Sequence, residues 1–154
     1  MSQLRKIDHV AYACASGMIE KWAWFQIEVE GGTLIKRIDD ARPGDPHSSM
    51  KIWCIDYGNF GIALIEGIDR AGKSQVTSFV EKHGDHSCQH VAYDCHDLDA
   101  FIRRMKSMGG HPRGGVLVQD AINEDDREPF FDLSRIPPDW KVPAERPKVA
   151  AGQS

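Results

Sequence analysis

Hydrophobic residues in the first two thirds of the chain alternate with polar residues in short runs, as in strands that are buried on one side. Between some of these runs the apolar positions recur at helical spacing, as on the inner face of a helix packed against a sheet. This pattern predicts strands at 6–14, 33–38, 50–56, 60–66 and 87–95 and helices at 17–29, 75–83 and 98–108. Asp97 is expected to cap the last helix and Gly109 to end it. After residue 110 the pattern becomes irregular, with strands predicted at 116–122 and 129–134.

One six-residue phrase occurs twice, as His-Val-Ala-Tyr-Ala-Cys at 9–14 and as His-Val-Ala-Tyr-Asp-Cys at 90–95. Each copy lies in a predicted strand that a predicted helix follows, which indicates two copies of one supersecondary unit. We therefore predict an α+β fold of two βαβββ modules, with the second module shortened. The predicted organisation is a single domain at 1–135, with module one at 5–67, a linker at 68–86, module two at 87–135 and a C-terminal tail at 136–154.

Composition narrows the classes of function. The 154 residues, 41% of them hydrophobic, are enough for one domain with a real core. A net charge of -4 and the absence of a basic run argue against a nucleic-acid partner, which needs clustered lysine and arginine. No apolar run approaches bilayer length and the N-terminus lacks signal-peptide character, so we expect a soluble, cytoplasmic chain with no membrane partner. The four cysteines lie in apolar strands and are expected to be buried thiols.

The repeated histidines are the main candidates for chemistry. If His9 and His90 meet across a pseudo-twofold axis they begin a metal site, because neutral imidazole is a common ligand of iron, zinc and nickel. The alternative is that both are core histidines satisfied by neighbouring backbone groups. The other histidines fall in loops or at element ends and are expected to be solvated: His47, His83, His86, His96 and His111.

Two histidines alone hold a metal weakly, so a third ligand is needed. Asp132 is the preferred candidate, because an unpaired carboxylate inside an apolar strand would cost several kcal/mol to bury and metal coordination removes that cost. In the alternative, Asp132 points to solvent on an edge strand. Gln119, Asp120 and Glu66 are the fallback ligands.

Several short phrases spread over residues 7 to 135 carry a family resemblance. They are Ile-Asp-His-Val at 7–10, Ile-Ala-Leu-Ile-Glu-Gly at 62–67, Lys-Ser-Gln-Val at 73–76, Gln-His-Val-Ala at 89–92, Leu-Val-Gln at 117–119 and Phe-Phe-Asp-Leu-Ser-Arg at 130–135. With them the chain resembles the vicinal oxygen chelate (glyoxalase/dioxygenase) superfamily, and within it the catalytic domain of 4-hydroxyphenylpyruvate dioxygenase. This resemblance implies paired βαβββ modules that form a metal-binding cup. The first hundred residues also resemble methylmalonyl-CoA epimerase.

The dioxygenase resemblance implies a triad of His9, His90 and Asp132 around Fe(II), with Gln119 facing the substrate. That family has a glutamate where this chain has Asp132. Two other positions bear on the substrate side. Ile65 stands where the dioxygenase has a substrate-contacting asparagine, and Lys51 stands where the epimerase has its catalytic glutamate. Ala63 occupies the position at which glyoxalases and epimerases place a fourth ligand, and alanine binds no metal.

Three functions follow from this pattern. The first is an Fe(II) dioxygenase-like enzyme acting on a 2-oxo acid or a similar bidentate substrate. The second is an isomerase or lyase of the glyoxalase or methylmalonyl-CoA epimerase type, which needs no oxygen and accepts other divalent ions such as Co(II), Ni(II), Zn(II) or Mn(II). The third is a non-catalytic small-molecule binding protein of the same fold. A homodimer is expected, because a shortened second module leaves a sheet edge to cover.

Overall fold

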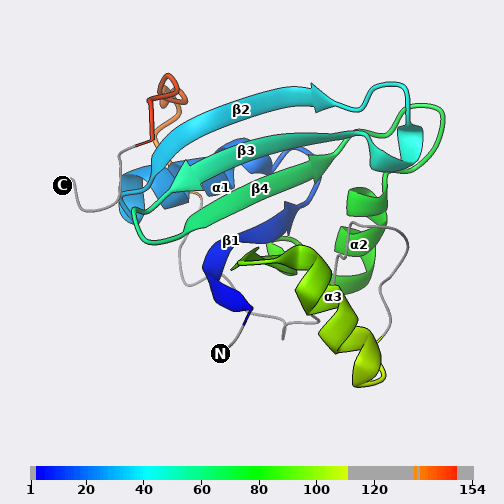
Figure 1. Cartoon of the computed structure of the whole chain (residues 1–154). Helices are drawn as coiled ribbons and strands as arrows, with labels where there is room; N and C mark the ends of the chain where they lie inside the picture. The colour runs from blue at the N-terminus through cyan, green and yellow to red at the C-terminus, as the bar shows by residue number, and fades with distance from the viewer. Residues whose placement is uncertain (1–2, 111–133, 135, 149–154) are drawn as a thin grey trace.

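The computed structural model describes residues 3–110, 134 and 136–148 (Figure 1). The strands are β1 (Leu4–Cys14), β2 (Thr33–Ala41), β3 (Met50–Asp56), β4 (Gly61–Gly67) and β5 (Ser87–Cys95). The helices are α1 (Ile19–Trp24), α2 (Gln75–His83) and α3 (Leu98–Ser107), with a π-helical continuation of α1, η1 (Phe25–Val29), and a short 3-10 helix, η2 (Pro46–Ser48). The predicted α+β class is confirmed. The predicted strand at 116–122, and all of the strand at 129–134 except Ser134, lie outside the described residues, so the paired modules and the complete cup stay predictions.

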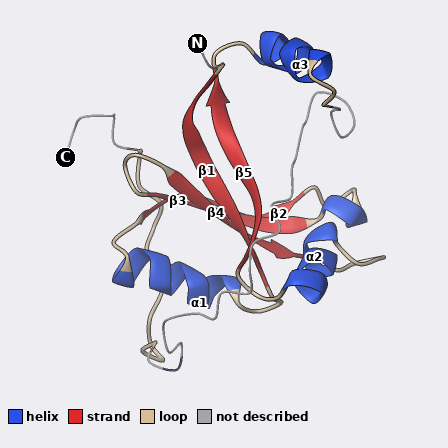
Figure 2. Ribbon diagram, turned by 90° about the horizontal axis from the view of Figure 1, so that it is seen from below, coloured by secondary structure: helices blue, strands red, loops and turns tan. Residues whose placement is uncertain are grey.

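The strands form one mixed sheet in the order β2-β3-β4-β1-β5. β1 runs parallel to β4, and every other neighbouring pair is antiparallel. Because β1 and β4 are parallel and belong to one β-α-β-β-β unit, the first module has the connectivity that the hydrophobic pattern predicts. Figure 2 shows α3 beyond the end of the β1 and β5 pair, away from α1 and α2, and no residue of α3 is buried.

The repeated phrase pairs with itself. In the antiparallel ladder between β1 and β5, Val10 lies opposite Val91, His9 opposite Ala92, and Ala11 opposite His90. This register is symmetric about the two valines, as a local twofold axis requires. Residues two apart in a strand share a face with each other and with the residues opposite them, so His9 and His90 lie diagonally on one face of the sheet.

The two faces of the sheet have different partners. On one face α1 packs against the main core, in which Trp22, Trp53, Ile55 and Leu64 are buried together. On the other face Val76 of α2 packs against strand side chains at one end of the sheet only. The rest of this second face carries both histidines of the repeat, and no helix among the described residues packs over them.

The predicted tail makes specific contacts with the first module. The indole Nε1 of Trp140 donates a hydrogen bond to Glu28 Oε1 over 3.0 Å, and Trp140 and Val142 pack against the core under α1. The backbone N–H of Arg146 donates to the carbonyl of Leu34 in β2 over 3.0 Å. These contacts cover part of the edge strand β2, which would otherwise offer unpaired backbone groups.

The cysteines are free thiols, of which Cys14 and Cys88 are buried and Cys54 and Cys95 are partly buried. Burial raises the pKa of the Cys14 and Cys54 thiols, so both favour the unreactive protonated form. Within the described residues no helix is long and apolar enough to cross a membrane. The homodimer stays a prediction.

Candidate functional site

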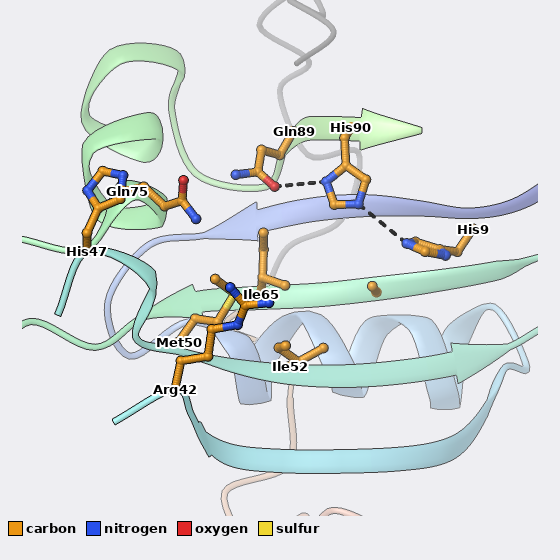
Figure 3. Close-up of a pocket in the computed structure, with 10 residues that line it drawn as sticks. His9, Arg42, His47, Met50, Ile52, Ile65, Gln75, Gln89 and His90 are labelled. Carbon is orange, nitrogen blue, oxygen red and sulfur yellow. Dashed lines mark hydrogen bonds between the residues drawn. The ribbon is translucent and has the colours of Figure 1, made fainter. Parts of the chain in front are cut away.

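A cavity of about 720 Å³ opens on the sheet face opposite α1 (Figure 3). Its floor is apolar and comes from β3 and β4, through Met50, Ile52, Ala63 and Ile65. At one end of the cavity stand His9, His90 and Gln89, and toward the other stand Arg42, His47 and Gln75. The site therefore combines an apolar centre with polar groups at both ends, which is typical of small-molecule sites.

The two imidazoles face each other, with 3.4 Å between His9 Nε2 and His90 Nε2. The carboxylate of Asp8 accepts a hydrogen bond from His9 Nδ1 over 2.8 Å, and Gln89 Oε1 accepts one from His90 Nδ1 over 2.9 Å. With the proton of each neutral ring on Nδ1, where it meets its acceptor, the two Nε2 atoms that face each other both carry lone pairs. Two such atoms need a proton or a cation between them.

The pair has the properties of metal ligands. Burial, and then the neighbouring His9, lower the pKa of His90, which favours the neutral imidazole that metals bind. Nitrogens bound at about 2.1 Å to one tetrahedral ion lie roughly 3.4 Å apart, as these two do. An outer hydrogen bond on Nδ1, like those from Asp8 and Gln89, is the usual way in which proteins orient a histidine ligand. The donor set therefore fits a divalent ion.

A third ligand is not found among the described residues, where no group of three His, Cys, Asp or Glu side chains converges. The preferred third ligand, Asp132, and the alternatives Gln119 and Asp120 lie outside the described part of the chain. Glu66, the remaining fallback, points to the opposite face of the sheet, where its Oε1 accepts hydrogen bonds from the backbone N–H groups of Met18 and Ile19. The predictions for Asp132 and Gln119 stay predictions.

The structure separates the two predicted substrate contacts on β3 and β4. Ile65 lines the cavity, and so does Ala63. Lys51 lies between Met50 and Ile52, which both face the cavity, so its side chain leaves the strand on the other side. There its Nζ lies 3.6 Å from Glu66 Oε2. The structure thus does not bring Lys51 to the cavity, because the alternation of β3 turns it toward α1.

One histidine that the sequence places in solvent is in fact enclosed. The ring of His86 stacks between Trp22, at a centroid distance of 3.9 Å, and Tyr12, at 4.6 Å. Its backbone has a φ of 59°, in the left-handed region. The expectation that His86 is solvated is therefore wrong, because a loop residue was folded back onto the core by contacts distant in sequence. No local signal marks it.

Replacing His86 by phenylalanine should make the free energy of unfolding less dependent on pH below about pH 6.5. Burial lowers the pKa of His86 to about 4, whereas an unfolded histidine titrates near 6.5. Between these values the unfolded chain binds more protons than the folded one, so stability is full above pH 6.5 and falls as the pH drops toward 4. We expect a loss of about 3 kcal/mol over this range in the wild type, from the shift in pKa. Urea unfolding of the wild type and of His86→Phe at pH 7.0, 5.5 and 4.5 measures the free energy of unfolding at each pH. If the variant loses as much stability as the wild type between pH 7.0 and 4.5, His86 is not the cause of the loss.

No protein-family profile matches the chain. A curated protein of Caenorhabditis elegans, whose name states no activity, is 29% identical over 104 residues. That match takes in 66% of this chain, and the chain spans only 29% of the length of that relative. Its similarity therefore says nothing about the function of the whole protein.

Solved structures share the fold. One is methylmalonyl-CoA epimerase from Mycobacterium tuberculosis, with a TM-score of 0.54 and 24% sequence identity. The match covers 71% of this chain and 67% of the epimerase chain. A second is a variant of the epimerase from Streptomyces coelicolor, with a TM-score of 0.51 and 21% sequence identity. The match covers 73% of this chain and 81% of the epimerase chain. A third is a variant of 4-hydroxymandelate synthase from Streptomyces coelicolor, with a TM-score of 0.56 and 17% sequence identity. The match covers 71% of this chain but only 31% of the synthase chain. Together with the paired histidines on the shared sheet, these matches show that the chain has the vicinal oxygen chelate fold.

Proposed function

We propose that this chain is a metal-dependent enzyme of the isomerase, epimerase or lyase type, acting on a small molecule with two neighbouring oxygen atoms. The observation that carries the proposal is the pair of Nε2 atoms of His9 and His90, 3.4 Å apart on one sheet face. His9 and His90 would hold a divalent ion there, with Asp132 as the expected third ligand. Bound there, the ion would supply Lewis-acid stabilisation for negative charge that develops on the substrate oxygens.

Other residues of the chain orient the two imidazoles and exclude water from the site. Asp8 and Gln89 keep the imidazoles in one tautomer and orientation through hydrogen bonds of 2.8 and 2.9 Å. The apolar floor formed by Met50, Ile52 and Ile65 keeps water away from the substrate carbon, and this strengthens every electrostatic interaction at the site.

The reaction class needs a group that takes a proton from carbon. Lys51 is on the far face of the sheet, and none of the described lining residues is a carboxylate. His47 lines the cavity toward the end away from the histidine pair (Figure 3). A general base must lie within hydrogen-bond reach of the proton that it removes, so His47 is not placed to act on a carbon beside the histidine pair. We therefore assign no described residue as the proton carrier. Similar structures also include an epimerase solved with methylmalonyl-CoA, which makes that thioester a rational first substrate to test.

An oxygen-activating enzyme is the second candidate. Ala63 lines the cavity, and alanine has no donor atom, so β4 would supply no ligand to an ion held by His9 and His90. Fe(II) is the expected metal of an oxygen-activating enzyme at this site, because two histidines and one carboxylate form the ligand set of non-haem iron oxygenases. The two candidates differ in whether oxygen is consumed.

Deuterium exchange under argon tests the proposal. Protein loaded with Co(II) is incubated in deuterium oxide with methylmalonyl-CoA and with a panel of 2-oxo and 2-hydroxy acids, and NMR follows exchange at the carbon next to the carbonyl. We expect exchange without oxygen, and a fall of about 100-fold or more in His90→Ala, which removes a proposed metal ligand. Turnover by the Fe(II) protein only with oxygen uptake would overturn the isomerase proposal in favour of the oxygenase. Tight binding without turnover under either condition would identify a binding protein.

A further inference from the structure

We propose that Arg42 anchors a carboxylate of the substrate, so that the cavity selects small acids with a second negative charge at the end away from the histidine pair. This inference rests on the proposed function and names its substrate class. The guanidinium lines the cavity (Figure 3), and the lining contains no acidic side chain among the described residues. A cation that lines the cavity, with no acidic side chain among the described lining residues, favours an anionic ligand.

Arg42 is exposed, and among the described residues it differs from the other arginines near the sheet in having no acidic partner. Three other arginines on or beside the sheet form ion pairs with aspartates: Arg5 with Asp94, Arg37 with Asp39, and Arg70 with Asp40. Within the described residues Arg42 has no such ion pair, so its five N–H donors are available to a ligand. An arginine fork binds a carboxylate through two parallel hydrogen bonds, which gives geometric as well as electrostatic selection.

The backbone of Arg42 is held in an unusual conformation. Its φ of 55° lies in the left-handed region, which non-glycine residues rarely adopt. The hydroxyl of Ser49, a fully buried residue, donates to the carbonyl of Arg42 over 2.9 Å, and the N–H of Asp45 donates to it over 3.1 Å. Backbone strain that the surrounding structure maintains is concentrated at functional sites, and here it fixes where the arginine leaves the chain.

The strand register sets the length of the proposed substrate. Ala63 lies level with the histidine pair, because it is opposite Ala11, which is itself opposite His90. Arg42 follows Ala41, which the ladders place level with Met50 and Gly67. From Ala63 to Gly67 a strand advances about 13 Å, and β2 lies two strand spacings, about 10 Å, to the side of β4, so the long arginine side chain covers much of the separation. A short dicarboxylic acid, with one end at the histidines and the other at the guanidinium of Arg42, would bridge the remaining distance between them.

Calorimetric binding of matched acid pairs tests this assignment. The Co(II)-loaded protein is titrated with 2-oxoglutarate and 2-oxopentanoate, and with 2-oxoadipate and 2-oxohexanoate; the members of each pair differ in whether the tail ends in a carboxylate. We expect the wild type to prefer at least one dicarboxylic acid by about 10- to 100-fold over its partner, as for a charge-assisted bidentate contact. Arg42→Gln should reduce this preference to about one, with unchanged affinity for the monocarboxylic acids.

Two further variants separate the possible failures. Arg103→Gln makes the same charge change on the exposed surface of α3 and should keep the preference. His90→Ala should weaken both members of a pair equally and also keep the preference. A preference that persists in Arg42→Gln, or is absent in the wild type, would overturn the role of Arg42. Unchanged affinities in His90→Ala would instead overturn the proposed metal site and leave the carboxylate anchor standing.

Discussion

Substitution of His90 by alanine should abolish tight binding of a divalent ion and reduce any metal-dependent turnover by at least about 100-fold, since even loss of an outer hydrogen bond to a ligand costs about 10- to 100-fold. His90 supplies one of the two Nε2 atoms that face each other across 3.4 Å, and the described residues offer no third donor to replace it. Anaerobic titration of metal-free protein with Co(II), followed by its d–d absorption, measures the affinity directly.

Two variants make this result specific. His96→Ala removes an exposed imidazole that directly follows β5, and it should leave Co(II) binding unchanged. Gln89→Ala removes the acceptor that orients His90 and should weaken binding about 10-fold, because the ring then samples other orientations. If His90→Ala binds Co(II) as tightly as the wild type, the repeated histidines are structural and the proposed function is wrong.

Replacement of Glu66 by alanine should lower the free energy of unfolding by about 3 to 5 kcal/mol, the range for breaking a buried charged interaction. Glu66 is 4% exposed, and its Oε1 accepts hydrogen bonds of 2.9 and 3.0 Å from the N–H groups of Met18 and Ile19. These groups begin α1, whose N-cap residue makes no side-chain hydrogen bond of its own. The glutamate on β4 therefore caps the helix from across the core, and its removal leaves these helix donors without that buried acceptor.

Urea unfolding of three variants at pH 7 separates the contributions of Glu66. Glu66→Gln keeps an acceptor of the same shape for the helix N–H groups, so it should lose clearly less than Glu66→Ala. Lys51→Met removes the cation 3.6 Å away, and because Lys51 is partly exposed the loss should stay below about 1 kcal/mol. A loss below about 1 kcal/mol for Glu66→Ala would show that water replaces the carboxylate at the start of α1.

The sequence alone determined the elements, because their causes are local. Alternation of apolar and polar residues located each of the five described strands to within a few residues, and the spacing of apolar residues located the helices. The side chain of Asp97 accepts from the N–H of Ala100, as an N-cap at that position should, and Gly109 has a φ of 87° just after α3. The repeated phrase correctly indicated that His9 and His90 are equivalent, since repetition is visible without coordinates.

Only the tertiary structure decided which of these residues meet. The register of β1 against β5 is a long-range choice, and it alone brings the two Nε2 atoms to 3.4 Å. The face on which Lys51 emerges follows from how β3 is seated on the core, and the burial of His86 follows from aromatic rings distant in sequence. Arg42 gave no signal in the sequence, because its place in the cavity depends on a strained turn held by a buried serine. Local patterns fix periodicity within a segment, whereas packing between segments fixes which side chains share a cavity and which are buried.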